Sequence, residues 1–148
     1  MKVIEHITDI DAPVASVWDV LVDVAAYRQW NPFLSIERFP ERVGERLSVT
    51  VRAGKRAMTL RPTVTRLELG RSLCWSGRLF VPRLFDGAHE LHVEPLEEGR
   101  SRFVHRETFR GVLVPFVGGT LRDTADGFAE MNAALRDRAE TRAGARTA

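Results

Sequence analysis

The chain has 148 residues, of which 44% are hydrophobic and 28% are charged, a composition typical of one globular domain with a substantial core. The net charge is only +2, and no dense basic run with interleaved aromatics is present, so nucleic-acid binding is not expected. The lone Cys74 excludes an internal disulfide and a zinc site built on cysteines. We expect a cytoplasmic protein, because no segment has the apolar character of a signal peptide or the length of a membrane span.

The first third of the chain predicts a strand followed by two short helices. A strand over Lys2–Ile10 is followed by Pro13, which suits the first turn of a helix over Val14–Val22. A second short helix over 23–29 ends before Pro32, because the residue that precedes a proline avoids the helical conformation.

The middle of the chain alternates between apolar and polar residues, as strands do. Strands are expected at 35–39, 46–53, 58–69 and 72–80. Pro62 lies inside one of them and predicts an edge strand or a bulge, because proline cannot donate a ladder hydrogen bond. After a hairpin over 85–111, apolar residues recur at helical spacing from Val117 to Leu135. About 25 residues at 1.5 Å each give a helix of roughly 37 Å, long enough to cross a sheet.

The hairpin over 85–111 has two different faces. Side chains two residues apart share one face of a strand. The odd positions of both strands form a mostly apolar face that also carries His89, His105 and Glu107. Polar groups on such a face need partners, which can be the protein itself, water or a ligand. The even positions form a face for water and carry Asp86, Glu90, Glu94, Arg102, Arg106 and Arg110.

The turn of this hairpin predicts its register. The sequence Glu97-Glu98-Gly99 suits a three-residue loop with glycine in the left-handed conformation, flanked by Leu96 and Arg100. This register places His89 opposite Glu107, with His105 diagonal to His89. It also predicts three cross-strand charge pairs: Glu94 with Arg102, Glu90 with Arg106, and Asp86 with Arg110.

Three segments carry a resemblance to a known family: DAPVASVWDVLVDVAAYRQWNPF, LCWSGRL with LFDGAHELHVEPLEEGRSRFVHRETFRG, and GFAEMNAALRDRAE. They resemble the START-like, or SRPBCC, superfamily and its polyketide cyclase/dehydrase-like branch. The resemblance implies an α+β helix-grip fold, in which a curved antiparallel sheet of about seven strands wraps around a long C-terminal helix and two short helices follow the first strand. Residues 1–142 would form a single START-like domain, and 143–148 a disordered tail.

The resemblance also implies a deep cavity between the sheet and the long helix that holds a hydrophobic small molecule. The hairpin face and the helix stripe together predict its lining: Trp75, Leu79, Phe85, His89, Leu91, Phe103, His105, Glu107, Phe109, Leu121 and Phe128. Three further aromatics are expected near a mouth formed by loops: Trp30, Phe33 and Phe116. Apolar walls with a few polar groups are typical of ligand sites, but the same aromatics could simply fill the core.

His89 and Glu107 allow two interpretations: a pair that moves protons or orients a polar substrate group, or a satisfied buried pair. With His105 they would also make a two-histidine, one-carboxylate ligand set, but nothing in the spacing demands a metal. No cofactor is expected, because no phosphate loop or Gly-x-Ser-x-Gly motif is present.

The expected function is binding of a hydrophobic or aromatic small molecule. One alternative is a polyketide cyclase- or dehydratase-like enzyme that uses His89, His105 and Glu107 as acid–base groups. Another is a lipid carrier or partner-binding module. Stable membrane association is not expected, and pairing of two copies through a sheet edge or Trp30 and Phe33 stays open.

Overall fold

The computed structural model describes residues 1–79 and 83–147. The elements follow one another in an order that matches the sequence prediction: β1 (Lys2–Ile10), α1 (Val14–Val22), the 3-10 helix η1 (Val24–Gln29), β2 (Leu34–Ile36), β3 (Val49–Ala53), β4 (Arg56–Leu60), β5 (Thr63–Glu68), β6 (Ser72–Leu79), β7 (Phe85–Pro95), β8 (Ser101–Arg110), the 3-10 helix η2 (Val114–Phe116) and α2 (Gly118–Thr147).

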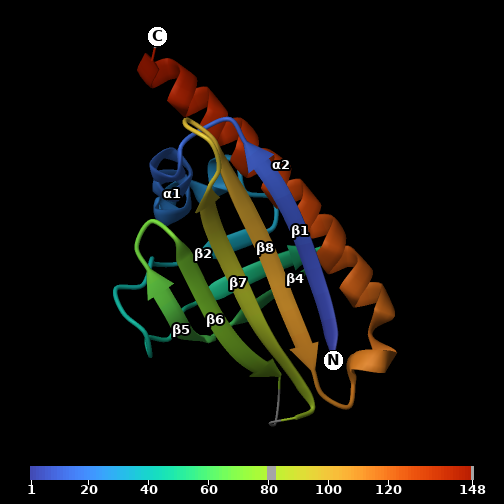
Figure 1. The fold of residues 1–148 in the computed structure, drawn as a ribbon. Helices are drawn as coiled ribbons and strands as arrows, with labels where there is room; N and C mark the ends of the chain where they lie inside the picture. The colour runs from blue at the N-terminus through green and yellow to red at the C-terminus, as the bar shows by residue number, and fades with distance from the viewer. Residues whose placement is uncertain (80–82, 148) are drawn as a thin grey trace.

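The strands form a curved antiparallel assembly of two sheets. The large sheet has the order β1-β8-β7-β6-β5, and the small one has the order β2-β3-β4. Figure 1 shows the small sheet crossing behind the large one and α2 running alongside β1. This is the α+β helix-grip arrangement that the sequence predicts, with a long helix held inside a curved sheet.

The described residues form eight strands rather than about seven, because the strand predicted over 58–69 is divided at Pro62. Pro62 has no N–H to donate, and its carbonyl accepts from the backbone N–H of Leu47 at 2.9 Å. The chain therefore leaves the small sheet after Leu60 and enters the large one at Thr63. There it forms the edge strand β5, whose register shifts between Val64 and Arg66. The predicted edge position and irregularity are both confirmed.

The register of the β7–β8 hairpin is the predicted one. The Leu96 N–H donates to the Arg100 carbonyl at 3.1 Å, and Gly99 has a φ of +76° in the left-handed region. His89 pairs with Glu107 across the two strands.

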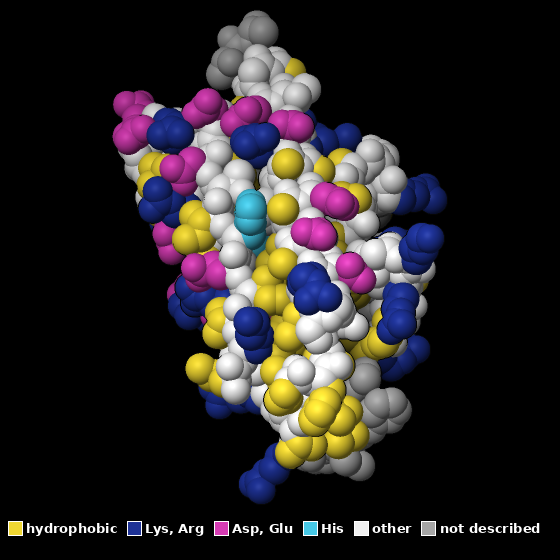
Figure 2. Space-filling model, turned by 90° about the vertical axis from the view of Figure 1, so that its right-hand side faces the viewer, with side chains coloured by type: hydrophobic (Ala, Val, Ile, Leu, Met, Phe, Trp, Pro, Cys, Tyr) yellow, Lys and Arg dark blue, Asp and Glu magenta, His cyan; other side chains and the backbone are white. Residues whose placement is uncertain are grey.

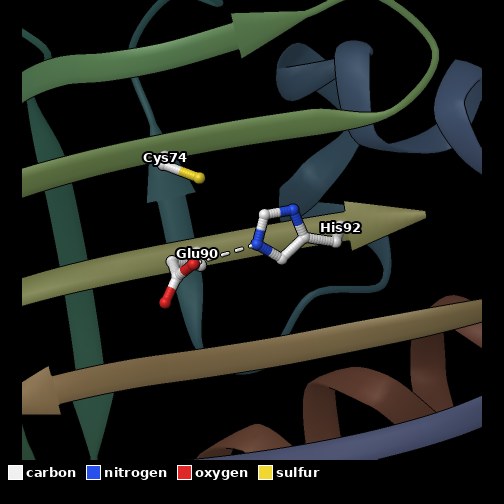
Figure 3. A group of neighbouring side chains, drawn as sticks. All are labelled: Cys74, Glu90 and His92. Carbon is white, nitrogen blue, oxygen red and sulfur yellow. Dashed lines mark hydrogen bonds and ion pairs between the residues drawn. The ribbon is translucent and has the colours of Figure 1, made fainter. Parts of the chain in front are cut away.

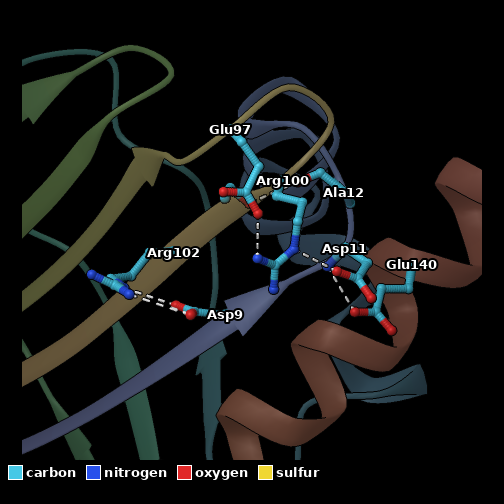
Figure 4. A network of polar contacts seen from close by, with 8 residues as sticks. Asp9, Asp11, Ala12, Glu97, Arg100, Arg102 and Glu140 are labelled. Carbon is cyan, nitrogen blue, oxygen red and sulfur yellow. Dashed lines mark hydrogen bonds and ion pairs between the residues drawn. The ribbon is translucent and has the colours of Figure 1, made fainter.

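The three predicted charge pairs lie opposite one another in the strand register, but β8 also pairs with β1, which supplies closer partners for Arg102 and Arg106. Arg102 donates to Asp9 of β1 at 2.8 Å rather than pairing with Glu94 (Figure 4). Arg106 likewise donates to Glu5 of β1 at 2.6 Å, while its distance to the predicted partner Glu90 is 3.9 Å. Among the described residues, no ion pair joins Asp86 to Arg110. These are exposed pairs and contribute little to stability.

The helix α2 buries one stripe against the large sheet and continues further than predicted. The buried stripe consists of Leu121, Phe128, Met131, Leu135 and Ala139. Residues 143–147, predicted as part of a disordered tail, are helical instead, because Ala143 still packs against the core. Glu140 accepts the backbone N–H of Asp11 at 2.8 Å, which ties α2 to the end of β1 (Figure 4).

Candidate functional site

A chain of hydrogen bonds crosses the layer between the large sheet and α2. Glu107 Oε2 lies 3.2 Å from His89 Nδ1, and His89 Nε2 lies 2.8 Å from His105 Nε2. His105 Nδ1 in turn lies 3.0 Å from Oδ1 of Asn132 on α2. The strand register brings the first three groups together, and the buried face of the helix supplies the fourth.

The contacts of Asn132 with β1 determine which atom donates in each of these hydrogen bonds. Asn132 Nδ2 contacts the His6 carbonyl and Thr8 Oγ1, each at 3.1 Å. Because a carbonyl only accepts, Nδ2 is the donor there and Oδ1 is the acceptor toward His105. His105 therefore carries a proton on Nδ1. When its ring is neutral, its Nε2 accepts from the Nε2–H of His89.

One proton must then lie between His89 and Glu107. With its Nε2–H already donated, a neutral His89 presents a lone pair at Nδ1, and an ionised Glu107 presents only acceptors. Two acceptors 3.2 Å apart would repel one another. The pair is therefore either an imidazolium beside a carboxylate or a neutral imidazole beside a carboxylic acid. In both forms it holds one transferable proton.

Lowering the pH below about 6.5 should destabilise the protein through His105. Burial above all, and then the nearby His89, hold the pKa of His105 well below its ordinary value of 6.5. The unfolded chain therefore binds a proton that the folded ring rejects, and stability present above pH 6.5 is lost as the pH falls. The loss is up to about 1.4 kcal/mol per pH unit. Thermal unfolding of the wild type and His105→Gln between about pH 7.5 and about pH 5.5 measures it. Equal slopes in both proteins would contradict it.

Aromatic rings pack around the two histidines. Trp75 stacks on His89 with ring centroids 4.6 Å apart, and Phe128 stacks on His105 at 3.6 Å. Phe33 meets Phe128 edge-on at 5.4 Å. The space around His105 is therefore filled by side chains, and the histidine itself is fully buried.

The side chains in this series of hydrogen bonds are more exposed to solvent toward Glu107. The side chain of Glu107 is 18% exposed, compared with 3% for His89. Beside it the rings of Phe85 and Phe109 lie 5.4 Å apart, and Phe85 is only half-buried. Between them on the inward face stands Gly87, where an added Cβ would lie 3.0 Å from Glu107 Oε1. The inner face of the sheet is thus less completely buried at this end of β7 and β8.

The same end of the molecule carries exposed apolar side chains. Met1, Val112 and Phe116 are exposed, Phe116 by 81%. Figure 2 shows hydrophobic side chains gathered at this lower end, where Figure 1 places the N-terminus and the loop after β8.

The predicted lining residues occupy different depths. Leu91, Phe103 and Leu121 are buried in the core, and Trp30 is half-buried with its ring against Tyr27. Leu79 pairs with Phe85 across the two strands, but its side chain lies outside the described residues.

The three candidate metal ligands do not converge on one point. The Glu107 carboxylate contacts Nδ1 of His89, whereas the Nε2 atoms of His89 and His105 face one another. Their arrangement suits proton sharing rather than joint coordination of an ion.

Asn132 is the functional group that the sequence reasoning missed. It follows Phe128 by one helical turn, so a polar residue in the buried stripe of the predicted helix was the available signal. The backbone carbonyl of His6 on β1 accepts a hydrogen bond from the same asparagine.

The comparisons agree with this architecture. The family described as polyketide cyclase / dehydrase and lipid transport matches residues 1–140. No curated protein matches the chain. No helix among the described residues is both long enough and apolar enough to span a membrane.

Solved structures show the same fold at low identity. A START superfamily protein of Mycobacterium smegmatis is 16% identical with a TM-score of 0.67, covering 94% of this chain and 97% of that one. The Zhui aromatase/cyclase of Streptomyces sp. R1128 is 20% identical with a TM-score of 0.63, covering 99% and 96%. A Chromobacterium violaceum protein is 16% identical with a TM-score of 0.68, covering 93% and 96%. Because the family model covers residues 1–140, the chain belongs to the polyketide cyclase / dehydrase and lipid transport family.

Proposed function

We propose that the protein binds a hydrophobic or aromatic small molecule between the large sheet and α2, anchored by His89 and Glu107. The observation that carries the proposal is the 3.2 Å contact between His89 Nδ1 and Glu107 Oε2, which lies within an aromatic layer with Glu107 as its more exposed member. Apolar walls with a few convergent polar groups are what small-molecule sites consist of.

The polar anchor defines the ligand further. Phe85 and Phe109 offer ring faces beside Glu107, so a flat apolar ligand gains contact area there. The His89–Glu107 pair can donate its proton to a carbonyl or accept one from a hydroxyl. The ligand we expect is therefore mostly apolar, with at least one hydrogen-bonding oxygen.

Native mass spectrometry of the protein as purified from cells tests this proposal. We expect a bound small molecule that is released on denaturation and is lost in Gly87→Leu, because an added Cβ already lies 3.0 Å from Glu107 Oε1 and the new side chain would displace this carboxylate. Ala88→Leu on the same strand is the matched control, since residue 88 is exposed on the opposite face and should retain the ligand. Binding of the fluorescent probe anilinonaphthalene sulfonate should follow the same pattern. Equal binding by the two variants would contradict the proposed location.

Acid–base catalysis is a second candidate function, which the shared proton favours. In this case Glu107 and His89 would exchange a proton with the substrate, and His105 would act as a positioning residue that fixes the tautomer of His89. The two functions differ in Glu107→Gln. A carrier that tolerates the amide keeps its ligand and shows no turnover in either form, whereas an enzyme of the cyclase or dehydratase type keeps binding a candidate polyketide and loses turnover.

A further inference from the structure

We propose that the outer face of the large sheet carries a site for one thiophilic divalent cation, such as Zn²⁺, formed by Cys74, Glu90 and His92. The site is separate from the His89–Glu107 pair, because these side chains point to the opposite face of the sheet. The strand register creates it: Cys74 on β6 pairs with Glu90 on β7, and His92 follows Glu90 by two residues. Figure 3 shows the three side chains beside one another on the two strands.

The donor atoms are close to coordination distances. His92 Nε2 lies 3.0 Å from Glu90 Oε1, and one donor atom from each of the three residues lies within 4.8 Å of the others. Donors around a tetrahedral zinc ion stand roughly 3.3–3.7 Å apart, as bond lengths of about 2.0–2.3 Å require. The histidine nitrogen and the carboxylate oxygen need to move apart by roughly 0.3 Å, and the sulfur needs to move inward by roughly one ångström.

Ser72 holds the imidazole in the orientation that a metal ligand needs. Its Oγ lies 2.8 Å from His92 Nδ1, on the side of the ring away from Glu90. Without a metal, Nε2–H donates to Glu90 and the hydroxyl donates to Nδ1. With a metal on Nε2, the ring proton lies on Nδ1, and the Nδ1–H then donates a hydrogen bond to the same hydroxyl oxygen. A hydrogen bond to the second ring nitrogen is the usual support of a metal-bound histidine.

The charges at the site match a dication. A thiolate and a carboxylate together carry two negative charges, and the imidazole is neutral. A bound cation would displace the proton of the Cys74 thiol, because the thiolate is the form that binds a metal. Arg66 has a carboxylate partner in Glu68, and Arg106 donates to Glu5 while also lying 3.9 Å from Glu90.

Two of the three ligands are partly exposed, so a fourth coordination position would be open to water. Cys74 is 6% exposed, whereas the side chains of His92 and Glu90 are 17% and 28% exposed. Three protein ligands with a fourth position open to water form the coordination of an exchangeable site rather than a closed structural one.

Titration with Co²⁺ and competition by Zn²⁺ test the site in the whole protein. We expect one ion per chain and a thiolate-to-cobalt charge-transfer absorption that Zn²⁺ abolishes. Cys74→Ser should remove the absorption, His92→Gln should weaken binding at least tenfold, and Ser72→Ala should weaken it about tenfold with the absorption retained. Zn²⁺ should also raise the melting temperature of the wild type but not of Cys74→Ser.

Glu94→Gln is the matched control, because Glu94 lies two residues beyond His92 on the same face and is exposed. It should bind Co²⁺ as the wild type does. Absence of stoichiometric binding to the wild type, or equal affinity in His92→Gln and Glu94→Gln, would overturn the proposal. So would binding that is retained in Cys74→Ser and lost in His105→Gln, because the ion would then lie inside the protein.

Discussion

Replacing Asn132 by leucine should lower the free energy of unfolding by about 3 kcal/mol, although the two side chains are similar in size. Asn132 is fully buried, and its amide satisfies the Nδ1–H of His105, the carbonyl of His6 and the hydroxyl of Thr8. Leucine leaves all three without a partner, and each orphaned buried group costs roughly 1–3 kcal/mol. The added apolar surface offsets part of this cost. Urea unfolding followed by circular dichroism measures the difference.

Thr124→Val is the control for this substitution, because it also exchanges a buried polar group on α2 for an apolar one of similar shape. The Thr124 hydroxyl only donates to the Thr120 carbonyl within the same helix, so its loss should cost less than about 1 kcal/mol. Nitrogen NMR of the imidazoles gives a second readout, since the His105 tautomer should change only in Asn132→Leu. Equal stability of the two variants would mean that the hydrogen-bonded chain does not support the fold.

Gly127→Ala should destabilise the protein by about 2 kcal/mol, even though alanine favours helices more than glycine does. A Cβ at position 127 would lie 2.3 Å from Cδ1 of Phe33, far inside contact distance. Overpacking of this kind costs roughly 1–3 kcal/mol or more, and the higher helix propensity of alanine offsets about 1 kcal/mol of this cost at most. Thermal and urea unfolding both measure the effect.

Gly144→Ala supplies the comparison, because it lies in the same helix and a Cβ there meets no atom within 4 Å. Its stability should be unchanged or raised by up to about 1 kcal/mol. Adding Phe33→Leu to Gly127→Ala should recover part of the loss, since it removes the ring that the new methyl group strikes. A Gly127→Ala protein as stable as Gly144→Ala would show that Phe33 moves aside without cost.

The sequence predicts best where one local feature decides the structure. The turn at Gly99 determines the register of β7 and β8, and that register places His89 opposite Glu107 before any tertiary contact is considered. The fold follows in the same way from the order of the elements and the apolar stripe of α2.

Features that depend on an element outside the β7–β8 hairpin could not be predicted from the sequence. The arginines of β8 bond to β1 because that strand completes their other side, which the hairpin alone does not reveal. The donor and acceptor roles of Glu107, His89 and His105 depend on Asn132, a residue of α2 that is distant from the hairpin in sequence. The filled space around His105 depends on how the rings of Phe33 and Phe128 pack, which residue patterns do not specify.

The pairing of β1 with β8 has a consequence for how the chain is synthesised. β1 precedes the other strands of the large sheet along the chain, yet its hydrogen-bonding neighbour begins at Ser101 and its helix contact, Asn132, comes later still. The nascent chain therefore carries an unpaired strand, with Val3 and Ile7 on the face that stays exposed, through most of translation. Contacts so distant in sequence slow folding and leave such edges open to wrong partners. Completion of the large sheet must therefore wait until β8 has been synthesised.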